Sequence, residues 1–344
     1  MEKKERQPVY YSEYLQLDKI LNAQHTESGK EGIRADDEML FIIIHQAYEL
    51  WFKQILHELT IVRQIFQQPN IPDNSPDVYN SVHRLKRVCR ILDIAVSQMA
   101  VLETMTPLDF LDFRDLLRPA SGFQSIQFKM IEASLGLKFQ HRHGQNYYLT
   151  QLTPADVERV KEAENQESLL VLINRWLERM PFIRESSYWA LENSERPFWQ
   201  QYRTAYENSL QEGEKINLRS FDQLFMDKEY PTERSLSADA NRNALFIMLY
   251  RDYPLLQLPY ELLSTLLEID ELLSLWRHRH IHLVQRTIGK RLGTGGSSGA
   301  DYLAKAADSH YVFRELAELT SFLLPRSMLP KLPEALVKDL SYRK

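Results

Sequence analysis

The apolar residues between positions 36 and 66 recur at the spacing of an α-helix. This segment reads DDEMLFIIIHQAYELWFKQILHELTIVRQIF. Its apolar side chains mostly fall three or four positions apart, at Leu40, Ile43, Ile44, Ala47, Leu50, Trp51, Ile55, Leu59 and Val62. Because a helical turn takes about 3.6 residues, they share one face of a single long helix. We expect Asp36 and Asp37 to cap its start, and the following QQPNIPDN to end it.

Helices are also expected over most of the remaining chain. Five of the 11 glycines lie between residues 289 and 299, so few tight turns are available elsewhere. Helical periodicity continues over 78–102, 122–135, 153–179, 194–212, 238–250, 261–288, 302–323 and 333–342. No stretch alternates long enough to predict a strand, although 139–152 fits a short hairpin or a surface loop. The sequence therefore predicts an all-α helical bundle, with residues 1–344 in one domain and a more polar helical excursion over about 155–235.

Composition narrows the class of function. The net charge of −5 gives no electrostatic reason to expect nucleic acid or an anionic membrane as partner. The first residues lack the features of a signal peptide, and no run of about 20 apolar residues could span a bilayer. The one cysteine, Cys89, lies in a helical stretch, and we expect it to be a buried thiol. These features favour a cytoplasmic protein.

Arg114 is a first candidate for ligand binding. It lies in TPLDFLDFRDLLRPASGFQSIQFK. Four nearby apolar residues could form a wall around its guanidinium: Phe110, Phe113, Leu117 and Phe123. An arginine in such a setting can hold a carboxylate through two parallel hydrogen bonds while the rings hold an aromatic body. From these residues alone, a surface ion pair is the commoner outcome, with Asp109, Asp112 or Asp115 as the partner.

The segment RLGTGGSSG, residues 291–299, is a second candidate. Glycines let a backbone fold closely against a ligand, and the hydroxyls of Thr294, Ser297 and Ser298 could contact an amino acid. A glycine-serine segment is more often a flexible connection. It lacks the Lys-Ser/Thr pair of a phosphate-binding loop and the strand before it, which argues against nucleotide binding.

Histidines supply the third group of candidates. In WRHRHIHLVQR, residues 276–286, His280 shares a helical face with apolar residues, whereas His278 and His282 share a more polar face. We interpret the latter pair as solvated. A lone imidazole on an apolar face is usually a hydrogen-bonded core histidine, but haem iron needs the same arrangement from its proximal ligand. His45, on the first long helix, is likewise interpreted by default as a hydrogen-bonded core histidine.

Five segments of the chain, in order, resemble blocks of the tryptophan 2,3-dioxygenase family. They are YSEYLQLDKIL, DDEMLFIIIHQAYELWFKQILHEL, TPLDFLDFRDLLRPASGFQSIQF, WRHRHI and GTGGSSG. The resemblance covers about residues 10–135 and 240–325. It implies a helical bundle of the tryptophan/indoleamine dioxygenase type, with haem b as cofactor and L-tryptophan and O2 as substrates.

The resemblance also implies roles for residues that bind substrate. Arg114 would bind the carboxylate of tryptophan, and Thr294 would contact its amino-acid end. Ser121 would lie close to haem and substrate. Four rings would line the indole site: Phe41 and Phe110, together with Tyr11 and Tyr14 from a neighbouring subunit of a homotetramer.

Two histidines receive haem roles from the resemblance. The proximal iron ligand would be His280, which the apolar periodicity also singles out. The distal histidine would be His45, placed to accept a hydrogen bond from the indole N–H. The implied activity converts L-tryptophan and O2 to N-formyl-L-kynurenine. Two alternatives stay open: a haem monooxygenase that acts on a substituted tryptophan or indole, and a tryptophan-binding protein without catalysis.

Overall fold

The computed structural model of the chain describes residues 8–69, 75–137, 152–183, 186–189, 198–227, 230–289, 291 and 310–341. Within these ranges the regular secondary structure is helical, with no β-strand, so the expected all-α class is confirmed. None of the described helices has the length and apolar content needed to cross a membrane.

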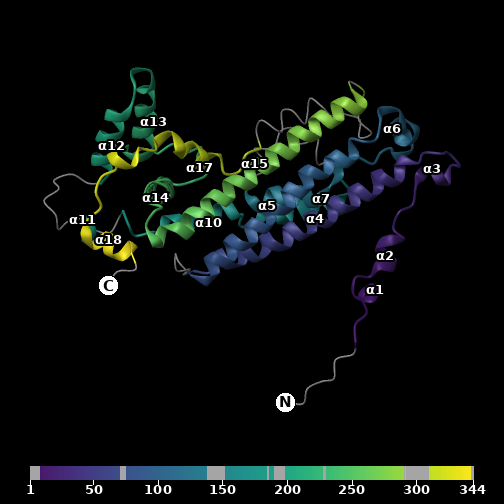
Figure 1. The fold of residues 1–344 in the computed structure, drawn as a ribbon, viewed down its shortest axis with the longest axis horizontal. Coiled ribbons are helices and arrows are strands. Elements are labelled where there is room, and N and C mark those ends of the chain that lie inside the picture. Colours follow the sequence, from purple (N-terminus) through teal and green to yellow (C-terminus); the bar gives the residue numbers. More distant parts are fainter. Residues whose placement is uncertain are drawn as a thin grey trace, which may run out of the picture.

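Three long helices lie side by side and frame the molecule (Figure 1). They are α4 (Asp37–Phe66), α5 (Pro76–Leu102) and α15 (Pro254–Ile288). Helix α5 packs against both α4 and α15, and the shorter α7 (Ile126–Leu135) packs against α4. Because α4 and α15 carry His45 and His280, this frame fixes the two histidines relative to each other.

The other helices pack around this frame or extend from it. Before α4 lie α1 (Tyr11–Tyr14), α2 (Leu17–Leu21) and α3 (Glu27–Lys30). Between α5 and α15 lie α6 (Pro107–Arg114), α9 (Pro154–Asn165), α10 (Leu169–Glu178), α11 (Ser186–Trp189), α12 (Phe198–Ser209), α13 (Ile216–Phe225) and α14 (Ala238–Leu249). After α15 lie α17 (Arg314–Glu318) and α18 (Glu334–Leu340).

Polar residues at helix starts explain several of these boundaries. Ser75 accepts a hydrogen bond from the Val78 N–H, and Pro76 occupies the first turn of α5, where its missing N–H costs nothing. Thr106 and Asp109 cap α6 reciprocally, since each side chain accepts from the other residue's N–H. These caps satisfy backbone donors that a helix leaves unpaired in its first turn.

Several expected boundaries are wrong in detail. Asp36 makes no capping hydrogen bond to α4; its carboxylate instead accepts from Arg34, at 2.8 and 3.0 Å. The expected helix over 153–179 is interrupted between α9 and α10, and of 302–323 the described part is helical only from Arg314 onward. Nearly all of the hairpin or loop expected over 139–152 lies outside the described residues.

The buried apolar side chains form a core that runs through the frame and the polar excursion. Trp176 and Tyr202 of the excursion belong to the same buried cluster as Leu59 of α4 and Leu266 of α15. This shared cluster supports one domain, which stays a prediction. Cys89 lies in the cluster as expected, with burial raising the pKa of its thiol to about 12.

The N-terminal helices do not join this core. Figure 1 shows α1 and α2 extending away from the bundle, beyond the end that holds α3 and α6. The side chains of Tyr11 and Tyr14 are 75% and 74% exposed, which is unusual for aromatic residues. The chain that follows α2 is held against α4, because the side chain of Gln46 donates a hydrogen bond to the backbone carbonyl of Ala23 at 3.1 Å.

Candidate functional site

A cavity of about 600 Å³ lies between α4, α5, α6, α7 and α15. This volume is in the range of pockets that hold small molecules and cofactors. Most of its wall is apolar, with polar groups at separate points of the lining. Six sequence-predicted residues line it: Phe41, His45, Phe110, Arg114, Ser121 and His280. The structure thus brings together residues that are up to 239 positions apart in the chain (280 − 41).

Aromatic rings form one part of the wall. Phe41 of α4 lies 5.7 Å from Phe110 and 5.6 Å from Phe113, measured between ring centroids. Phe110 and Phe113 lie three positions apart on α6 and pack edge to face at 5.4 Å. Of these three rings, Phe41 and Phe110 line the cavity and can contact a flat apolar ligand, whereas Phe113 is fully buried and packs against both of them.

His45 enters the cavity from α4 with one ring nitrogen already bonded. Its Nδ1 lies 2.7 Å from the backbone carbonyl of Phe41, one turn earlier. Because a carbonyl only accepts, Nδ1 must carry the proton, and Nε2 of a neutral ring is then an acceptor. Burial lowers the pKa of His45 despite this hydrogen bond and the nearby Glu49. A neutral His45 therefore offers the cavity a hydrogen-bond acceptor.

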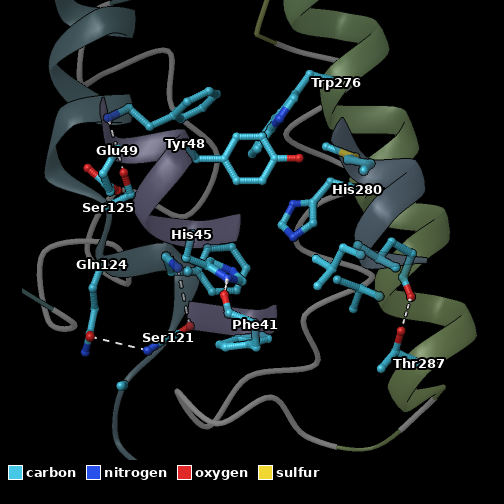
Figure 2. A pocket seen from close by; sticks show the side chains of 18 of the residues that line it. Phe41, His45, Tyr48, Glu49, Ser121, Gln124, Ser125, Trp276, His280 and Thr287 are labelled. Atoms are coloured by element: carbon cyan, nitrogen blue, oxygen red, sulfur yellow. Dashed lines mark hydrogen bonds between the residues drawn. The ribbon is translucent and has the colours of Figure 1, made fainter. Parts of the chain in front are cut away.

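His280 enters from α15, on the opposite wall (Figure 2). Burial, with a smaller contribution from His45, lowers its pKa to about 4. Its Nδ1 is enclosed and has no hydrogen-bond partner among the described residues. The ring of Trp276, one turn earlier, lies 5.1 Å away between centroids. His280 is therefore a neutral imidazole held by packing.

Arg114 differs from the commoner expectation of a surface ion pair. Only 5% of its side chain is exposed, and it lines the cavity from the end of α6. Its contact with the exposed Asp115 is long, at 3.7 Å between Nη1 and Oδ1. A buried guanidinium at the wall of an otherwise apolar cavity is suited to bind an anionic group of a ligand.

Ser121 lies in a turn whose backbone is fixed by its own side chains. Its hydroxyl accepts from the Phe123 N–H, and the Gln124 side chain accepts from the Ser121 N–H, each at 3.3 Å. Figure 2 shows Ser121 and Gln124 on the side of the cavity that also holds His45. Ser125 then caps α7 through the Phe128 N–H.

The remaining predicted residues lie elsewhere. Tyr11 and Tyr14 lie on α1, outside the cavity of their own chain. Thr294 lies outside the described residues. His278 and His282 are exposed, as their polar helical face indicated.

Several cavity residues were missed by the sequence analysis. Tyr48 and Trp276 lie three and four positions from His45 and His280, so helical spacing places them beside the two histidines, although they were given no role in the site. Glu132, Arg277 and His310 also line the cavity and are buried. No local pattern marks these three, since their association is tertiary.

The cavity fits a haem group on its own chemistry. Haem iron takes a neutral imidazole on its proximal side, and His280 is neutral, half-buried and lines the cavity. The largely apolar wall suits a porphyrin, and His45 faces His280 from the opposite wall. Both rings can present Nε2 to iron, since the Nδ1–H of His45 donates to the Phe41 carbonyl as metal-bound imidazoles commonly do. The choice of His280 as the proximal ligand rests on the family resemblance and on its apolar helical face.

Comparison with known proteins places the whole chain. The sequence profile described as tryptophan 2,3-dioxygenase matches residues 1–323. A tryptophan 2,3-dioxygenase of Alteromonas mediterranea is 42% identical, with 99% of each chain covered. That of Bdellovibrio bacteriovorus is 40% identical over 97% of this chain and 98% of its own, and that of Dictyostelium discoideum is 41% identical over 97% and 88%. With a profile that spans nearly the whole chain and relatives at this identity, the chain belongs to the tryptophan 2,3-dioxygenase family.

Proposed function

We propose that this chain is a haem-dependent tryptophan 2,3-dioxygenase, which converts L-tryptophan and O2 to N-formyl-L-kynurenine. Membership of the family supports the reaction. The observation that carries the proposal is the placement of two neutral histidines and a buried arginine around one apolar cavity. Each of these three groups has a distinct task in such a reaction.

His280 holds the cofactor, which is haem b, as its proximal ligand. When bound, haem supplies the iron chemistry that activates O2, which no amino-acid side chain provides. The enclosed position of His280 keeps its ring neutral, so that a nitrogen lone pair is available for iron. Packing against Trp276 keeps the ring in one orientation.

Arg114 and the aromatic wall orient L-tryptophan. The guanidinium of Arg114 binds the substrate carboxylate, and Phe41 and Phe110 contact the indole. Ser121 lies close to haem and substrate, and Thr294 contacts the amino-acid end. Fixing both ends of the substrate holds the indole C2–C3 bond in one place, which lowers the entropic cost of reaction.

His45 orients the indole ring. Its Nδ1 proton is engaged by the Phe41 carbonyl, so Nε2 accepts a hydrogen bond from the indole N–H. Because burial keeps the ring neutral, this acceptor is present at pH 7. His45 therefore selects for a substrate with a ring N–H donor.

A homotetramer completes the site. Tyr11 and Tyr14 are exposed on α1 and lie outside the cavity of their own chain, which is consistent with aromatic residues that pack against a neighbouring subunit. Neither nucleic acid nor a membrane is expected as a partner. The cytoplasmic location stays a prediction.

A turnover experiment tests this function. The purified, haem-loaded protein is reduced and mixed with L-tryptophan in air, and the absorbance of N-formylkynurenine is followed. With 18O2, the product of a dioxygenase carries two labelled atoms. A product with one labelled atom would instead support the monooxygenase. Tryptophan binding with no oxygen uptake would support the binding protein without catalysis.

A further inference from the structure

A buried ionic cluster lies in the cavity wall, and the proposed reaction does not use it. Arg277 donates from Nη2 to Oε1 of Glu132 at 2.7 Å, and from Nη1 to the backbone carbonyl of His310 at 2.9 Å. The ring Nδ1 of His310 lies 3.4 Å from the same oxygen of Glu132. All three residues are at most 6% exposed, and all three line the cavity.

This cluster joins three separate parts of the chain. Arg277 belongs to α15, Glu132 belongs to α7, and His310 begins the described segment that follows α15. Two further contacts dock this segment on α15. Asp270 accepts from the N–H groups of Val312 and Phe313 at 3.1 and 2.5 Å, and Ser274 pairs with Tyr311 at 2.8 Å. Asp270, Ser274 and Arg277 thus lie on three successive turns of α15, and each of them contacts this segment. Arg277 is one turn before His280.

The ring of His280 depends on this docking for its position. Its Nδ1 has no hydrogen-bond partner among the described residues, so packing must orient it. The ring packs against Trp276 at 5.1 Å, and Trp276 packs against Phe128 of α7 at 4.7 Å. Any shift between α15 and α7 would therefore move Trp276, and the imidazole with it.

We propose that Glu132 and Arg277 are positioning residues for the iron-ligand histidine, because their buried pair fixes the turn of α15 that carries His280 against α7. Neither side chain needs to touch the reacting atoms. The inference rests on the proposed function, since it takes His280 as the ligand of haem iron. It extends that function by naming the residues that set how the ligand meets the iron.

Glu58 provides a matched control. It is a second buried carboxylate, 1% exposed, and it accepts from Arg84 and Arg87 at 2.9 and 2.8 Å. Its network joins α4 to α5 but does not line the cavity. Loss of either carboxylate leaves arginine charge without its partner, so Glu58→Gln and Glu132→Gln should both lower stability. Only Glu132→Gln should disturb His280.

The experiment uses the full-length protein, loaded with haem for spectroscopy and freed of haem for the binding titration. Two quantities are measured for wild type and both variants: the iron–histidine stretching band of the ferrous protein by resonance Raman spectroscopy, and the affinity for added haem. Glu132→Gln is expected to shift the band and to weaken haem binding by about 10–100-fold. Glu58→Gln is expected to lower the melting temperature while leaving the band and the haem affinity as in wild type. The proposal is overturned if Glu132→Gln leaves the band unchanged, or if both variants change it equally.

A second variant covers a failure of Glu132→Gln to fold. Glu132→Met combined with Arg277→Met removes both charges and fills their volume, a change that buried pairs often tolerate. The same shift of the band is expected, and an unchanged band refutes the proposal. The wild-type spectrum also distinguishes a failure of the ligand assignment from a failure of the positioning proposal. If it lacks an iron–histidine band, both the ligand assignment and this proposal fail; if it has the band and the variants do not alter it, only this proposal fails.

Discussion

His45 and His280 carry the same ring, but the hydrogen bonding of their Nδ1 atoms differs. Burial lowers the pKa of both, so both are neutral at pH 7. In His45 the carbonyl of Phe41 fixes the tautomer, and Nε2 is left as an acceptor. In His280 the Nδ1 atom has no hydrogen-bond partner among the described residues, so no such bond fixes its tautomer. Each neutral ring can therefore offer a nitrogen lone pair to the cavity, and the proposed division of roles between the two histidines rests on the family resemblance.

Removal of the proposed iron ligand should remove the cofactor. His280→Ala leaves no imidazole on the α15 wall of the cavity, so the variant is expected to purify without bound haem and without dioxygenase activity. The haem Soret absorbance per chain measures this loss. His282→Ala is the control, because His282 lies two positions later and is exposed. Full haem content and activity in His280→Ala would refute the assignment.

Arg114 should govern the affinity for tryptophan rather than for haem. Hydrogen bonds to charged groups contribute about 1.5–3 kcal/mol, so Arg114→Met is expected to raise KM for L-tryptophan by about 10–150-fold. Haem content should be unchanged. Arg118→Met is the control, since Arg118 pairs with Asp115 at 3.2 Å but is 56% exposed. If the two variants have equal KM values, Arg114 does not bind the carboxylate.

At the residue scale, the sequence predicts which side chains belong to the site better than it predicts how buried those side chains are and what they contact. Periodicity alone separates His280 from the exposed His278 and His282, and the structure agrees. The burial of Arg114 was not predictable from its neighbours, because the acidic residues around it offered ready ion pairs. His310 carried no signal at all, since its contact with Glu132 spans 178 positions.

The elements show a similar limit at the junction of α9 and α10. Helical periodicity runs on through residues 153–179, and neither glycine nor proline marks a break between Asn165 and Leu169. Arg63 of α4 holds this junction open, since it donates to the Glu167 carbonyl and to the side chain of Gln166 at 2.8 and 3.0 Å. The start of α10 carries one local signal, since Ser168 caps it by accepting from the Val171 N–H, whereas the contact with Arg63, about 100 positions away, is not visible in local sequence.

Gly136 ends α7, and its surroundings leave no room for a side chain. Its φ is +140°, and an added Cβ would lie 2.7 Å from Cβ of Leu170. Gly32 also has positive φ, at +67°, but an added Cβ would meet nothing within 4 Å. Backbone strain of about 1–2 kcal/mol applies to both, whereas overpacking of about 1–3 kcal/mol applies only to Gly136. In urea denaturation, Gly136→Ala should therefore lose more unfolding free energy than Gly32→Ala; equal losses would contradict the packing seen here.

Asp270 should make the docking of the segment after α15 dependent on pH. Burial raises its pKa from 3.8 to about 6, although the N–H groups of Phe313 and Val312 and the charge of Arg277 oppose the rise. The folded state thus holds this proton more tightly than the unfolded state, and its stability falls as pH rises from about 4 to above 6. Asp270→Asn cannot ionise, so its unfolding free energy should decline less than that of wild type between pH 4 and 7. Parallel profiles for the two proteins would show that Asp270 does not titrate in this range.

At the scale of the whole molecule, the cavity and the N-terminal helices lie at the same end of the bundle. Phe41 and His45 belong to the first turns of α4, and the chain leading into α4 is tied to it by Gln46. Yet α1 extends away from the bundle in Figure 1, with Tyr11 and Tyr14 exposed. We call α1 and α2 the N-terminal arm. The hydrogen bond from Gln46 fixes the position at which this arm leaves the bundle, and the exposed Tyr11 and Tyr14 are available to contact another surface.

If that surface is the cavity of a neighbouring subunit, two inactive chains should restore each other. Tyr11→Ala with Tyr14→Ala leaves His280 intact but damages the arm, whereas His280→Ala leaves the arm intact but damages the cavity. In oligomers formed by co-expression of equal amounts, about a quarter of the sites should combine an intact cavity with an intact arm, since each condition is met in about half of the subunits. Activity of the co-expressed mixture is expected to approach that fraction of wild type and to exceed the sum of the two variants purified alone. Wild-type protein that is monomeric by light scattering, or a mixture no more active than its components, would show that each chain completes its own site.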